Sequence, residues 1–119
     1  MDSTPITIVR EGISRSELAV LAERQFGDMV KGVVDVARGI MAIGGELHSD
    51  EESVLLDDGS QQQDLWGINL YPAEREEQWI EFDSMINVRP SQRNRSRDVE
   101  DLGVREAIRR AVAALVSDT

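Results

Sequence analysis

The sequence predicts an α+β domain in which three helices pack on an antiparallel sheet of four to five strands. Three observations predict this class. The 119 residues fit one domain that is large enough to bury a hydrophobic core. Three segments carry the capping and spacing signals of helices, and the short apolar segments between them are separated by turn residues. The expected order is (β)-α-β-β-α-β-β-α, with the helices on one face or at one end of the sheet.

The clearest helix is predicted within residues 13–27. Ser14 and Glu17 have the spacing of a capping box, in which each side chain bonds the backbone of the other residue. Gly27 is placed just beyond the helix, where a positive φ ends many helices. A short strand over residues 6–9 is expected before it.

Residues 30–44 are ambiguous. Their valines fit a helical spacing, but they also alternate with polar residues as in a strand. The β-branched residues and the flanking glycines favour a hairpin with strands near 30–36 and 40–48. In that hairpin Gly39 takes a positive φ in the turn. A helix is the alternative for this segment.

The second helix is expected to begin at Ser49, because Ser49 and Glu52 repeat the capping-box spacing. Two strands follow, near residues 65–71 and 79–89, and Pro90 ends the second of them. The last helix is expected near 101–116, with Asp98 or Asp101 as its cap.

Composition excludes several classes of protein. The chain has no cysteine, so disulfides and thiolate metal sites are absent. No apolar stretch reaches the ~18 residues of a membrane span, and the N-terminus lacks the pattern of a signal peptide. We therefore expect a single cytoplasmic domain over residues 1–119, without a membrane association and with disordered tails at 1–5 and 117–119.

Charge is unevenly distributed along this acidic chain, whose formal net charge is -10. Residues 46–83 hold twelve acids and one base, whereas residues 87–97 hold four arginines and no acid. One interpretation is that the two segments are solvated or neutralise each other across the fold. The other is a basic binding patch on an acidic body. The overall acidity argues against a nucleic-acid partner.

His48, the one histidine, lies near Asp50 and other carboxylates. A histidine beside carboxylates is able to bind a cation or to act as a general base. The spacing matches no metal motif, and acids are common in the first turn of a helix. We therefore predict no metal, no cofactor and no catalytic residue, and we favour a hydrogen-bonded structural histidine at a strand end.

The arginine-rich segment contains the residues best suited to bind a carboxylate or a phosphate. Arg89 directly follows a predicted strand, so its position is the best fixed of the four arginines. An ion pair of Arg89 with Asp50 or Asp64 is the alternative. Asn69 lies in a predicted strand, where asparagine is disfavoured and needs a reason. The candidate binding residues are Arg89, Gln92, Asn94, Arg95, His48, Asp50, Trp66 and Asn69.

The segments "VVDVARGIMAIGGELHSD", "LLDDGSQQQDLWGINLYP" and "SMINVRPSQRNRS" resemble the signature of a small bacterial family of uncharacterised proteins. The resemblance covers roughly residues 30–97, and the family pattern has glycine in place of Arg93. It implies no activity. A second resemblance, to secretion chaperones, rests on size, acidity and element order alone. It implies binding of a peptide along a sheet edge, often by a dimer.

No catalytic constellation stands out, so enzymatic activity is left open and a non-enzymatic function is favoured. The leading hypothesis is a cytosolic module that binds a protein or peptide, and a homodimer fits the same reading. The alternative is a small-ligand-binding protein or enzyme with His48, Asp50, Arg89, Asn94 and Arg95 in one cleft.

Overall fold

A computed structural model describes residues 5–118 of the chain. Of the two tails expected to be disordered, residues 1–4 and 119 lie outside the described residues. In chain order the helices and strands are β1 (Thr7–Val9), β2 (Ile13–Ser14), α1 (Arg15–Arg24), β3 (Val30–Asp35), β4 (Ile40–Ile43), α2 (His48–Asp57), β5 (Leu65–Leu70), β6 (Ile80–Glu81), α3 (Leu102–Leu115) and β7 (Val116–Ser117). The three helices and the antiparallel sheet confirm the predicted α+β class.

The main sheet has five strands in the order β1-β4-β3-β5-β6, and every neighbouring pair is antiparallel. The segment 30–44 is therefore a hairpin, and the helical alternative is wrong. Its turn has two local causes. The Asp35 carboxylate accepts hydrogen bonds from the N–H groups of Ala37 and Arg38, both at 2.9 Å. Gly39 has a φ of 68°, as the turn requires.

A second, two-stranded sheet was not predicted. β2 and β7 pair in parallel, with Ile13 opposite Val116, so the beginning and the end of the domain lie side by side. Each strand has two residues, which is too short for a periodic sequence signal. This pairing places α1 and α3, which adjoin the two strands, close to each other.

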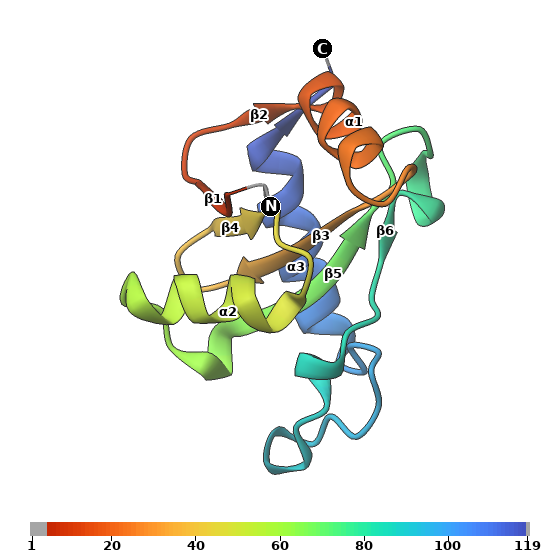
Figure 1. Ribbon diagram of the computed structural model, residues 1–119. Helices are drawn as coiled ribbons and strands as arrows, with labels where there is room; N and C mark the ends of the chain where they lie inside the picture. The colour runs from red at the N-terminus through yellow and green to blue at the C-terminus, as the bar shows by residue number, and fades with distance from the viewer. Residues whose placement is uncertain (1–4, 119) are drawn as a thin grey trace.

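The helices cover both faces of the main sheet (Figure 1). Leu18 and Ala22 of α1 and Ile108 and Val112 of α3 are buried on one face, and Leu55 of α2 is buried on the other. The expectation that all helices share one face or one end is wrong. Because both faces are covered, all six residues of β5 are buried, although their polarity alternates as in a half-exposed strand.

The predicted caps are confirmed for two helices and wrong for the third. α1 has the complete capping box between Ser14 and Glu17, and Asp101 caps α3. α2 begins at His48, with Leu47 as a cap residue that makes no side-chain hydrogen bond. Ser49 is therefore inside the first turn, because the helix is rotated to bury His48, Glu51 and Leu55.

The strand predicted over 79–89 is much shorter in the structure. β6 ends at Glu81, and residues 85–87 form a short single-turn helix. The Ser84 hydroxyl accepts from the N–H of Ile86 and starts this turn. The Asn87 amide then pairs with both backbone groups of Gly67, at 2.8 and 2.9 Å. A side chain thus occupies the place where the missing strand would bond β5.

Candidate functional site

Arg89 is used to build the fold. It is 8% exposed, and its guanidinium donates to the carbonyls of Gln62, at 2.6 Å, and Leu65. It also stacks on the Trp66 ring, 4.0 Å from the centroid. The alternative of an ion pair with Asp50 or Asp64 is wrong, because these backbone carbonyls and the ring take the guanidinium.

Asn94 and Gln92, which lie in the same loop as Arg89, also hold the fold of this loop in place. Asn94 is 3% exposed, and its amide nitrogen donates to the carbonyls of Asn87 and Asp98, both at 2.7 Å. Gln92 accepts from Arg89 and donates to the carbonyl of Gln63. Within the described residues, the side chains of Arg95 and Asp50 make no hydrogen bond to Arg89, Gln92 or Asn94, and both are exposed.

A first cavity brings together two of the predicted residues, His48 and Asn69. We call it the mixed-charge cavity; its volume is about 480 Å³. None of the other six predicted residues lines it. The lining residues are Met29, Lys31, Leu47, His48, Ser49, Asn69, Glu81, Asp83, Ser84, Met85, Ile86 and Arg97.

Cross-strand pairing sets the floor of the mixed-charge cavity. Lys31 on β3 lies opposite Asn69 on β5, and Asn69 lies opposite Glu81 on β6. Residues opposite each other project from the same face of a sheet, so these three side chains form one row. Asn69 Nδ2 donates to a Glu81 carboxylate oxygen at 2.8 Å, and the Tyr71 hydroxyl donates to the same oxygen at 3.0 Å.

His48 closes the mixed-charge cavity from α2. It is 9% exposed, and its Nε2 lies 2.8 Å from the carbonyl oxygen of Ile68. A carbonyl only accepts, so Nε2 carries a proton and donates. Burial lowers the pKa of His48, the nearby charge of Lys31 lowers it further, and hydrogen bonding to Ile68 and Asn69 opposes this shift. The ring is therefore neutral near pH 7.

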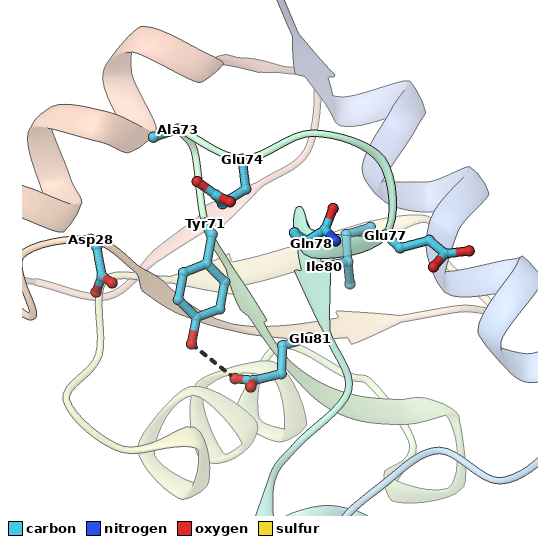
Figure 2. Close-up of a pocket in the computed structure, with 8 residues that line it drawn as sticks. All are labelled: Asp28, Tyr71, Ala73, Glu74, Glu77, Gln78, Ile80 and Glu81. Atoms are coloured by element: carbon cyan, nitrogen blue, oxygen red, sulfur yellow. Dashed lines mark hydrogen bonds between the residues drawn. The ribbon is translucent and has the colours of Figure 1, made fainter.

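A second cavity lies on the other side of Glu81, which lines both. We call it the acidic cavity; its volume is also about 480 Å³. Figure 2 shows Glu74 above the Tyr71 ring, Asp28 to one side, and Glu81 below, bonded to the tyrosine hydroxyl. The lining residues are Asp28, Tyr71, Ala73, Glu74, Glu77, Gln78, Ile80 and Glu81.

Among the described residues, the lining of the acidic cavity includes four carboxylates and no basic side chain. Within residues 5–118, none of the four forms an ion pair. In the same part of the chain, no three His, Asp or Glu side chains gather closely enough to hold one metal ion. Burial and the adjacent Glu81 raise the pKa of Tyr71 to about 12, so its hydroxyl keeps its proton and donates to Glu81.

Sequence reasoning missed Lys31, Glu81, Tyr71 and Asp28. Lys31 carried a usable signal: it is the one lysine in a chain that otherwise takes its positive charge from arginine. The acids carried none, because the sequence has 23 of them and most are solvated. Only strand pairing shows which of these acids share a cavity.

A family model described as "Protein of unknown function (DUF5674)" matches residues 7–115. The chain belongs to this family. The match takes in the five-stranded sheet, all three helices and every residue that lines the two cavities. Among curated proteins and among solved structures, nothing matches the chain. No helix in residues 5–118 has the length and apolar character needed to cross a membrane.

Proposed function

We propose that the chain is a protein-binding module that receives a basic side chain of its partner, lysine or arginine, in the acidic cavity. The observation that carries the proposal is the set of four carboxylates around one cavity without an ion pair in the described residues. Carboxylates that line one cavity give it a negative potential, which attracts a cation.

The Tyr71 ring is a second observation that favours a lysine or arginine side chain as the occupant of the acidic cavity. In Figure 2 the ring stands among Asp28, Glu74 and Glu81. An aromatic face attracts a cation and also covers the aliphatic part of a lysine or arginine side chain. The cavity volume of about 480 Å³ lies within the range of ordinary ligand pockets.

The wall of the acidic cavity is held in place before a partner arrives. Arg15 stacks on the Trp79 ring at 3.8 Å, and its Nη1 donates to the carbonyls of Pro72 and Glu74 at 3.3 and 3.2 Å. These contacts fix the loop between β5 and β6. A fixed wall reduces the entropy lost when a partner binds.

The position of the cavity favours a protein or peptide over a small amine. β6, which carries Ile80 and Glu81 of the lining, is an edge strand, and no other described strand pairs with its outer side. An extended segment of a partner is able to pair there by strand addition while its basic side chain enters the cavity. This reading retains the peptide-binding function that the sequence favoured.

The test is a titration of a fluorescent peptide that carries alternating arginines, followed by anisotropy. The double variant Asp28→Asn/Glu74→Gln removes two of the three exposed acids around Tyr71 and keeps Glu81, which bonds the tyrosine hydroxyl. We expect it to weaken binding by about tenfold or more, because each lost contact involves a charge.

The matched control is Asp57→Asn/Glu106→Gln, which removes the same charge from exposed positions outside the cavity. Equal loss of affinity in both double variants would show that only net charge attracts the peptide, and the proposal would fail. A second copy of the chain carries exposed arginines at 93 and 95, so sedimentation at low salt must accompany the titration.

A further inference from the structure

The mixed-charge cavity has the chemistry of a second, different site. Its lining holds two cations, Lys31 and Arg97, and two anions, Glu81 and Asp83. Arg97 and Asp83 pair with each other at 2.6 Å, whereas Lys31 forms no ion pair within the described residues. The cavity is thus balanced in charge, unlike the acidic cavity beside it.

The Asn69 side chain offers an acceptor that the described residues do not use. It is 6% exposed, and its Nδ2 is oriented by two acceptors, Glu81 at 2.8 Å and the carbonyl of Asp83 at 3.3 Å. These two bonds fix which end of the amide is nitrogen. Its Oδ1 is buried without a donor among residues 5–118. A buried acceptor in this state costs about 1–3 kcal/mol until a donor reaches it.

The neighbouring His48 does not satisfy this acceptor in its neutral form. A neutral imidazole has one N–H, and Ile68 accepts from it at Nε2. The donor for Asn69 Oδ1 is therefore His48 in its protonated form, a water molecule or a ligand that enters the cavity. An ammonium group fits, because Glu81 lies directly beside Asn69 and adds a negative charge.

The other end of the row formed by Glu81, Asn69 and Lys31 suits a carboxylate. Lys31 lies opposite Asn69 on the neighbouring strand, where paired Cβ atoms are about 5 Å apart. Its ammonium nitrogen lies 5.2 Å from the centroid of the Phe26 ring. α2 begins above it without a side-chain cap, and no acceptor for the N–H groups of His48 and Ser49 is found in the described part of the chain. Uncapped N–H groups at a helix start attract anions.

Part of the remaining wall is apolar. Met29, Leu47, Met85 and Ile86 line the same cavity, and Leu47 and Met85 are 54% and 65% exposed. An aliphatic side chain of a ligand would cover them. Methionines adapt to ligands of different shape because their side chains are flexible.

We propose that the mixed-charge cavity binds a free α-amino acid with an aliphatic side chain. Asn69 and Glu81 take the ammonium group, Lys31 and the start of α2 take the carboxylate, and the apolar wall takes the side chain. Lys31 and the pair of Asn69 and Glu81 lie at neighbouring positions of the sheet, which matches an ammonium and a carboxylate group attached to the same α-carbon. This site shares Glu81 with the acidic cavity, but the argument for it does not depend on the proposed protein partner.

The test uses the single lysine and the single histidine of the chain as reporters. Protein labelled with isotopes in both residue types gives one side-chain NMR signal set for Lys31 and one for His48. The probes are L-valine, L-isoleucine, L-leucine and L-methionine. Isocaproate and isoamylamine, which are leucine without its amine and leucine without its carboxylate, are the matched controls. We expect an amino acid to shift both signal sets and each control to bind far more weakly.

Three results would overturn the proposal: no shift with any of the four amino acids, equal binding of isocaproate or isoamylamine, or unchanged affinity in a Lys31→Met variant. Lys31→Met should weaken binding by about 10-fold to 100-fold, as expected for loss of a charged hydrogen bond. Arg110→Met, on α3 across the sheet, should have no effect. Asp28→Asn/Glu74→Gln should also leave amino-acid binding intact, which separates this test from that of the acidic cavity.

Discussion

The side-chain amide of Asn87 takes the place of a strand at the edge of β5. It donates to the carbonyl of Gly67 and accepts from its N–H, and a third bond goes to the carbonyl of Arg97 at 3.0 Å. Gly67 must lack a side chain here, because a Cβ atom would lie 2.5 Å from that of Ser84. The close approach of Ser84 to Gly67 and the two hydrogen bonds between the Asn87 amide and Gly67 therefore depend on each other.

Replacement of Asn87 by alanine should destabilise the fold by about 2–4 kcal/mol. The substitution leaves the N–H and the carbonyl of Gly67 buried without partners, and each such group costs about 1–3 kcal/mol. Urea unfolding followed by circular dichroism measures the loss. Ser91→Ala, at an exposed position of the same loop, should stay within about 0.5 kcal/mol of wild type. Similar midpoints for both variants would show that the amide pair contributes little.

At the scale of elements, Glu51 links α2 to the turn that follows β4. It is fully buried, and its Oε2 accepts from the N–H of Gly45 at 2.9 Å. Gly45 has to be glycine, since a Cβ atom there would lie 2.8 Å from Cγ of Glu51. Burial raises the pKa of Glu51 to about 9, so the carboxyl group is protonated at neutral pH.

This raised pKa predicts a pH-dependent stability. In the unfolded chain the group titrates near 4.5, so between pH 4.5 and about 9 the folded state binds one more proton than the unfolded state. The contribution of Glu51 is complete below pH 4.5 and is lost as pH rises toward 9, by about 1.4 kcal/mol per pH unit.

A Glu51→Gln variant should remove that slope, because glutamine does not ionise. Urea unfolding of both proteins at several values between pH 5 and about 9 measures the difference, which should grow with pH in favour of the variant. Asp57→Asn, at an exposed position of the same helix, is the control. Parallel curves for wild type and Glu51→Gln would show that Glu51 ionises normally.

At the scale of the whole molecule, acidic charge dominates. The formal net charge is -10, and the ion pairs within residues 5–118 involve mostly half-exposed or exposed groups, which contribute little. We therefore expect self-repulsion of the folded state to exceed the gain from these pairs.

Salt should consequently stabilise the protein. Raising sodium chloride from low to physiological concentration shortens the range of repulsion, to about 8 Å. We expect a higher melting temperature in calorimetry, whereas the arginine-rich peptide should bind more weakly under the same change. A melting temperature that falls with salt would mean that the ion pairs outweigh the repulsion.

Local signals sufficed for much of the fold. Ser14 with Glu17 and Gly39 act on backbone groups a few residues away, so their spacing predicted where the first helix begins and where the hairpin turns. For α3 the sequence left Asp98 and Asp101 open as the cap, and the structure shows Asp101. The strand that was predicted too long illustrates the limit. Apolar and polar residues alternate in that segment as in a strand. In the structure, however, Asn87 lies in a turn, and its side-chain amide makes the two hydrogen bonds to β5 that a neighbouring strand would otherwise make.

Of the candidate site, the sequence by itself identified His48 and Asn69 and indicated that the arginine-rich loop has a special role. Only the tertiary structure decided that role: Arg89 bonds carbonyls 24 and 27 residues away, so it builds the fold. Strand pairing alone placed Lys31 and Glu81 on either side of Asn69. The physical reason is the separation in sequence between the residues that interact. Caps and turns are set by neighbours in sequence, whereas a cavity is set by residues that only the folded sheet brings together.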